Sequence, residues 1–172
     1  MSSEKANQSS PSEQRHRTEE RLKTFLSTNM TVRFIIEAIE NKGCTIPSNF
    51  FRIRSCEGNI SGGFSMDPPS ASSPNSSPYI SICQDKDLEL ETFQNTVIHE
   101  LIHAYDKCRV KQLTTDNCKS HACTEIRAST LSGECNWIHE VFRGHPQYKL
   151  GHRDCVKRRA TKSVSLNPYC EV

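Results

Sequence analysis

Two histidines that flank a glutamate are the residues of this sequence whose types and spacing could do chemistry. His99, Glu100 and His103 lie in the segment HELIHAYD. In a helix, the spacing of four residues puts both imidazoles one turn apart on the same face, where they can bind one metal ion. Glu100 lies roughly 60° round the helix from His103, so it can reach a water molecule without binding the metal itself. The pattern predicts a hydrolytic zinc site with His99 and His103 as ligands and Glu100 as the catalytic base.

The same segment would also fit an ordinary amphipathic helix with two histidines on its polar face. Val97, Leu101 and Ala104 form an apolar stripe at helical spacing, and His99 and His103 fall on the remaining face. The segment also follows a strand candidate, and in that arrangement a peptide can lie along the edge of the strand. This context favours the zinc interpretation.

A catalytic zinc ion needs a third protein ligand and one open position for water. The candidates are Glu125 and His121, which share one face of a later helical segment, and Asp106, which lies one turn beyond His103. Three ligands from one straight helix would strain the tetrahedron, so Asp106 is better suited to orienting an imidazole. We predict Glu125 as the third metal ligand, because two histidines and a carboxylate are a recurring catalytic set. His121 and Asp106 stay open as alternatives.

Hydrophobic periodicity and turn residues predict the elements that must position these side chains. The predicted helices cover about residues 28–42, 87–106 and 121–131, and the predicted strands lie within 47–56 and 78–84. Between the strands, residues 61–77 are rich in Gly, Ser and Pro and predict a loop. The histidines and Glu125 are therefore expected on two different helices.

Length and charge indicate one domain without a nucleic-acid partner. The chain has 172 residues, and its net charge of +2 suggests no extended basic surface. Residues 1–20 are polar with little to bury, so we expect a disordered arm there and one domain over residues 21–172. No apolar run approaches the roughly 18 residues of a spanning helix. No apolar export signal and no presequence is recognisable.

Nine cysteines are many for a reducing compartment. They form no C-x-x-C pair, so a structural zinc site is poorly supported, and four disulfides with one free thiol are expected. The spacing of the cysteines does not determine which of them pair. The composition therefore favours an oxidising compartment.

Three blocks of the sequence resemble a known family. They read HELIHAYDKCR, NCKSHACTEIRASTLSGEC and CVKRRATKSVSLNPYC, and the resemblance covers roughly residues 28–172. In this order they resemble the mitochondrial inner-membrane metalloprotease family that matures a membrane subunit of the ATP synthase, also known as Ku-binding proteins. The resemblance implies zinc ligation by His99 and His103 and catalysis by Glu100. It also implies peripheral association with the inner membrane on its intermembrane-space side, and a chaperone role in assembly of the ATP synthase membrane sector.

We therefore expect an α+β fold, with a single zincin-like metalloprotease domain. A small sheet should pack on the helix that carries His99, and the C-terminal part should be rich in disulfides. The expected function is a zinc metalloendopeptidase that matures the precursor of an ATP synthase membrane subunit. The alternative is a non-proteolytic assembly factor on the same scaffold. Glu100 argues against it, because a scaffold has no need of a base beside its metal.

A basic cluster near the C-terminus allows two interpretations. It could hold the protein against anionic lipid headgroups, or it could be the solvated face of a helix. Its members are Arg153, Lys157, Arg158, Arg159 and Lys162.

Overall fold

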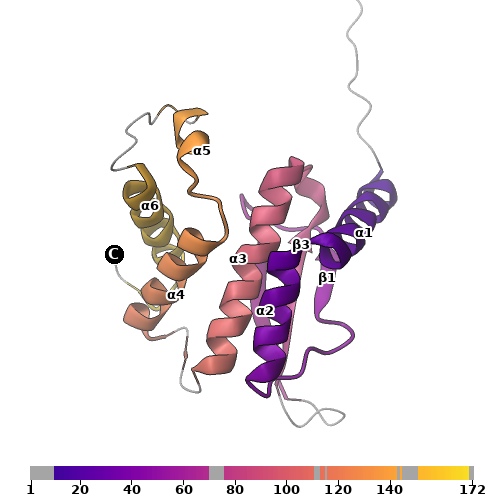
Figure 1. Cartoon of the computed structure of the whole chain (residues 1–172), viewed down its shortest axis with the longest axis horizontal. Coiled ribbons are helices and arrows are strands. Elements are labelled where there is room, and N and C mark those ends of the chain that lie inside the picture. Colours follow the sequence, from indigo (N-terminus) through magenta and orange to yellow (C-terminus); the bar gives the residue numbers. More distant parts are fainter. Residues whose placement is uncertain are drawn as a thin grey trace, which may run out of the picture.

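The computed structural model describes residues 10–69, 76–110, 113–114, 116–142, 144 and 151–170. Figure 1 shows α3 in the middle of the molecule, with the sheet, α1 and α2 on one side and α4, α5 and α6 on the other. The helices are α1 (Pro11–Thr28), α2 (Met30–Asn41), η1 (Gln84–Lys86), α3 (Leu90–Arg109), α4 (Cys118–Leu131), α5 (Trp137–Phe142) and α6 (Gly151–Ser165). The strands are β1 (Phe51–Arg54), β2 (Gly62–Asp67) and β3 (Ser77–Cys83).

The sheet has three strands in the order β1-β3-β2. β1 pairs parallel to β3, with Phe51 opposite Ile80, and β2 pairs antiparallel to it, with Phe64 also opposite Ile80. The sheet packs on α3, where Val97 and Leu101 are fully buried together with Ile80 and Ile82 of β3. The expected α+β architecture, with a small sheet on the histidine-bearing helix, is confirmed.

β2 corrects the prediction of a loop over residues 61–77. Six residues of that segment, Gly62–Asp67, form an edge strand along β3. Gly, Ser and Met have little strand preference, and the pairing comes from a partner strand that local sequence does not reveal. Residues 70–75, at the centre of the predicted loop, lie outside the described residues.

Helix α1 corrects the expectation of a disordered arm up to residue 20. Ser10 and Glu13 form a capping box, in which each side chain accepts a hydrogen bond from the other residue's backbone N–H, and Pro11 occupies the first turn. Leu22 and Phe25 are buried, and the ring of Phe25 contacts that of Phe93 edge to face. The cap and these two anchors stabilise a helix whose first turns are polar. Residues 1–9 lie outside the described residues.

Four disulfides and one free thiol are present, as the number of cysteines predicted. Two disulfides lie within the C-terminal part. The other two join the segment after α2 to α3 and the segment after β1 to β3, so the cross-links extend beyond the C-terminal part. The pairs are Cys44–Cys108, Cys56–Cys83, Cys118–Cys170 and Cys135–Cys155, and the exposed Cys123 is free.

Candidate metal centre

Helix α3 carries both histidines on the side that faces α4. It begins at Leu90, slightly later than predicted, because Asp87 adopts a left-handed conformation (φ 40°) after η1. The rings of His99 and His103 have centroids 4.7 Å apart. Burial of the apolar stripe against the sheet turns the two imidazoles away from the core and towards α4.

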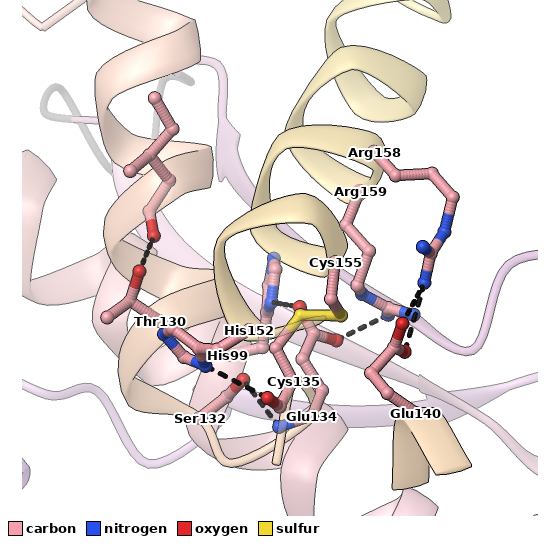
Figure 2. Close-up of a disulfide and its surroundings, with 11 residues drawn as sticks. His99, Thr130, Ser132, Glu134, Cys135, Glu140, His152, Cys155, Arg158 and Arg159 are labelled. Atoms are coloured by element: carbon pink, nitrogen blue, oxygen red, sulfur yellow. Dashed lines mark hydrogen bonds and ion pairs between the residues drawn. A yellow bond between two sulfur atoms is a disulfide. The ribbon is translucent and has the colours of Figure 1, made fainter. Parts of the chain in front are cut away.

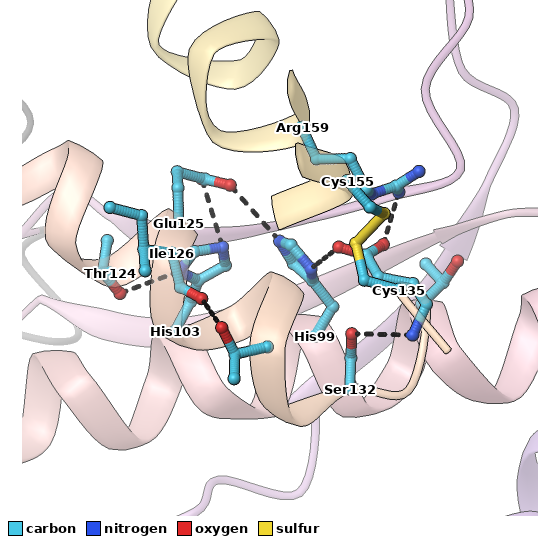
Figure 3. Close-up of polar contacts among 12 residues, drawn as sticks. His99, His103, Thr124, Glu125, Ile126, Ser132, Cys135, Cys155 and Arg159 are labelled. Carbon is cyan, nitrogen blue, oxygen red and sulfur yellow. Dashed lines mark hydrogen bonds and ion pairs between the residues drawn. A yellow bond between two sulfur atoms is a disulfide. The ribbon is translucent and has the colours of Figure 1, made fainter. Parts of the chain in front are cut away.

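Glu125 of α4 lies opposite the two imidazoles (Figure 3). One of its carboxylate oxygens is 3.5 Å from His99 Nε2, and the other is 3.3 Å from His103 Nε2. One potential ligand atom from each of the three residues lies within 4.8 Å of the others. Two imidazole nitrogens and a carboxylate oxygen match the ligand set of catalytic zinc sites, so the residues present fit this ion.

Each imidazole is held at its second nitrogen by another side chain. His99 Nδ1 lies 3.1 Å from a carboxylate oxygen of Glu134, and His103 Nδ1 lies 3.0 Å from Thr124 Oγ1. Glu134 also forms an ion pair with Arg159 of α6 (Figure 2). Contacts of this kind fix the orientation of a metal-binding ring and leave Nε2 free for the metal.

Asp106 lies outside the group of three and contacts His103 only through Thr124. The hydroxyl of Thr124 donates to a carboxylate oxygen of Asp106 over 2.8 Å. Arg109 and Arg127 donate to the same carboxylate over 2.7 and 3.1 Å, and Asp106 is 1% exposed. The structure thus connects Asp106 to an imidazole through one hydroxyl and pairs its buried carboxylate with two partly exposed arginines.

His121, the other alternative ligand, contacts Glu125 directly. His121 Nε2 lies 3.3 Å from a Glu125 carboxylate oxygen, and His121 Nδ1 lies 2.9 Å from the Asn167 side-chain amide. Asn117 caps the start of α4 by accepting from the backbone N–H of Ser120, so the helix begins at Cys118 and not at residue 121 as predicted. His121 therefore occupies the first turns of α4, where it contacts the same Glu125 oxygen as His103.

The charges in the site favour a cation. Burial disfavours an imidazolium at His99, but hydrogen bonds to Glu125 and Glu134 outweigh it and raise the pKa of His99 to about 10. Burial also disfavours charge on the carboxylates. Hydrogen bonds to His103 and His99 nevertheless hold the pKa of Glu125 well below its usual range, and contacts with His99 and Arg159 lower the pKa of Glu134 to about 2. Both carboxylates are thus ionised at neutral pH and can balance the charge of a divalent metal.

An open cleft passes over these residues. Two hollows of about 270 and about 700 Å³ share His99, Glu100 and Glu125 in their walls. The backbone N–H of Cys83 donates to the carbonyl of Ser61. Because antiparallel pairing alternates along a strand, the N–H and C=O groups of every second residue of β2 face its open edge. Those residues are Gly62, Phe64 and Met66, and all three line the larger hollow.

The sequence did not reveal Glu134 or Thr124. Glu134 follows the end of α4 and lies beside Cys135, whose disulfide to Cys155 joins this segment to α6 (Figure 2). The adjacent cysteine was a signal that the segment is held in place, but the partner of the disulfide was unknown. Thr124 precedes Glu125 and had no distinguishing pattern.

Comparison with known proteins gives a family and several relatives. The peptidase M76 family model matches residues 16–172. The chain is 42% identical over 119 residues to the mitochondrial inner membrane protease ATP23 of Malassezia globosa, covering 69% of the chain and 47% of that protein. It is 37% identical over 145 residues to the human mitochondrial inner membrane protease ATP23 homolog, covering 84% and 55%. With the protease of Neosartorya fischeri the identity is 36% over 156 residues, covering 90% and 62%.

The chain therefore spans about half to three fifths of the length of these curated relatives. No solved structure matches the chain. Within the described residues, no helix has the length and apolar character that crossing a membrane requires.

Proposed function

We propose that this chain, which belongs to the peptidase M76 family, is a zinc-dependent endopeptidase with a zincin-like active site. The observation that carries this proposal is the convergence of His99, His103 and Glu125 from two helices. Glu100 lies in the same cleft wall and is buried, so a general base is available beside the three ligand groups. The ligand set and the base together favour hydrolysis of a peptide bond.

In this mechanism His99, His103 and Glu125 hold the zinc ion. When bound, zinc supplies a Lewis acid that polarises the peptide carbonyl and makes water more acidic. Glu100 accepts a proton from the attacking water as the water oxygen bonds to the carbonyl carbon. The same carboxylic acid then donates that proton to the leaving amine when the C–N bond breaks. Glu134 and Thr124 keep the imidazoles oriented throughout, because each contacts an Nδ1 atom.

The proposed substrate is the precursor of a membrane subunit of the ATP synthase, cleaved on the intermembrane-space side of the inner membrane. The relatives are named mitochondrial inner membrane proteases, which supports peptide cleavage at the inner membrane. The four disulfides suit an oxidising compartment. Peripheral membrane association and help in assembly of the membrane sector belong to the same proposal.

Removal of the metal is the experiment that tests this function. Treatment with a zinc chelator should abolish cleavage of the subunit precursor by the purified protein, and added Zn²⁺ should restore it. Both results follow if the ligands hold the ion required for carbonyl polarisation. Mass spectrometry of the products measures cleavage, and circular dichroism checks that the chelated protein stays folded. Cleavage that continues at full rate without zinc would refute the proposal.

Gly62 lets the edge strand β2 approach α3 closely, one turn before Glu100. A Cβ at Gly62 would lie 2.8 Å from Thr96 Cγ2, 3.0 Å from the backbone oxygen of Ser81 and 3.5 Å from Glu100 Cγ. Gly62→Ala must therefore displace Thr96 or push β2 away from α3 and from the Ser81 backbone, whereas the distance to Glu100 is an ordinary contact. We expect this variant to lose about 1–3 kcal/mol of stability, as overpacking does elsewhere. It should also lose about tenfold or more in kcat/KM, because displacing a wall of the cleft by about 1 Å can cost up to about 100-fold.

Gly63→Ala is the matched control, because a Cβ at Gly63 meets no atom within 4 Å. Its stability and kcat/KM should stay close to those of the wild type. Thermal unfolding and cleavage assays of both variants make the comparison. Equal behaviour of the two variants would show that the close contact at Gly62 has no role in catalysis.

A further inference from the structure

A groove of about 380 Å³ lies between α4 and α6, separate from the cleft. Its floor is formed by Val156, Ala160 and Val164, which recur every four residues on α6, and Ala122 and Ile126 of α4 form the opposite wall. None of the described residues that line this groove lines either hollow of the cleft. The two helices therefore give one face to the cleft and another to the groove.

The structure divides the basic cluster into paired and unpaired members. Arg158 donates to both carboxylate oxygens of Glu140 over 3.0 and 2.9 Å, and Arg159 pairs with Glu134 (Figure 2). Arg153 and Lys157 lie one helical turn apart and line the groove, and both are exposed. Neither forms an ion pair with a described residue, and no described acidic side chain lines the groove. The groove thus combines an apolar floor with two positive charges at its rim that no described carboxylate pairs with.

We infer that this groove docks the protein on an anionic phospholipid bilayer. An apolar floor with a cationic rim complements acyl chains that lie beneath negative headgroups. The apolar floor and the cationic rim together favour a bilayer over an acidic peptide, because a bilayer offers acyl chains directly beneath a negatively charged surface.

Docking at the groove would bring the cleft close to the membrane. Glu125 and Ser129 of α4 and Ser163 of α6 line the cleft, while the other faces of these two helices line the groove. A bilayer at the groove would therefore be separated from the metal centre by the thickness of these helices. This part of the inference rests on the proposed function, because docking would bring the peptidase close to a substrate in the membrane.

Vesicle binding tests the inference. The wild type should cosediment with phosphatidylcholine vesicles that contain phosphatidylserine and much less with pure phosphatidylcholine. Arg153→Gln/Lys157→Gln should weaken binding to the anionic vesicles about 25-fold, because each basic residue near such a surface contributes about a fivefold factor. Ile126→Ser should also weaken binding, through loss of an apolar contact at the groove wall.

Lys23→Gln/Arg33→Gln is the control, since it removes the same charge from exposed positions on α1 and α2. It should bind the anionic vesicles within about twofold of the wild type, because charges more than about 10 Å from the surface are screened. Cleavage of a soluble peptide should be unchanged in all variants, so that a failure of docking is separable from a failure of the peptidase proposal. The inference would be overturned if both double variants lost vesicle binding equally. It would also be overturned if the wild type did not bind vesicles but bound a soluble acidic peptide at the groove.

Discussion

Replacement of Glu100 by glutamine is expected to lower kcat/KM about 10²- to 10⁴-fold and to leave zinc binding and folding intact. Glutamine has nearly the same shape but cannot accept the proton of the attacking water, and general-base catalysis contributes about this factor. The side chain lies beside the ligand groups and outside the group of three, so the metal should be retained. Cleavage of the subunit precursor, zinc content and thermal unfolding would be measured on the same preparation.

Glu91→Gln provides the matched control for this variant. Glu91 is an exposed residue in the first turn of the same helix, so its substitution changes the same charge away from the cleft. It should cleave like the wild type. Normal cleavage by Glu100→Gln would exclude the proposed mechanism. Assembly of the ATP synthase that persists with Glu100→Gln would show that a chaperone role exists independently of proteolysis.

Loss of the Glu125 carboxylate is expected to weaken zinc binding by more than about 100-fold. Glu125 is the group that contacts both Nε2 atoms, whereas residues that only support ligands typically cost about 10- to 100-fold when they are changed. In a competition titration with a zinc chelator, Glu125→Ala should therefore lose more zinc affinity than His121→Ala or Asp106→Ala.

Conservative variants guard against misfolding in that series. Glu125→Gln keeps the volume of the side chain and removes its charge, and Asp106→Asn avoids a cavity beside Arg109 and Arg127. Glu125→Gln should lose more zinc affinity than Asp106→Asn, in the same order as the alanine variants. Zinc affinity of Glu125→Ala equal to that of the wild type would show that Glu125 is not the ligand, and a larger loss in His121→Ala would assign the role to His121.

Local spacing explains which features could be predicted from the sequence. His99 and His103 share a face because four residues make one helical turn, and the same rule places Glu125 beside His121 on α4. The structure brings Glu125 to both imidazoles, while its role as a ligand stays a prediction. The helix itself was predictable from the apolar stripe that Val97 and Leu101 form, because helical periodicity can be seen in the local sequence.

The remaining features depend on partners that are distant in the sequence. β2 forms because β3 offers an edge, although Gly62 and Gly63 have low strand preference. Glu134 meets His99 only because the disulfide of Cys135 and the ion pair with Arg159 hold its segment against α6. No local pattern encodes such contacts, so the support of the imidazoles was invisible before the fold was known.

Anomalous diffraction at the zinc absorption edge, from crystals of the zinc-loaded protein, tests the metal centre most directly. A single strong peak is expected at bonding distance from His99 Nε2, His103 Nε2 and a carboxylate oxygen of Glu125, about 2.0–2.2 Å in each case. A peak bonded to the histidines but not to Glu125 would contradict the assigned ligand set. A peak elsewhere in the molecule, with these three side chains unchanged, would contradict the metal centre as a whole.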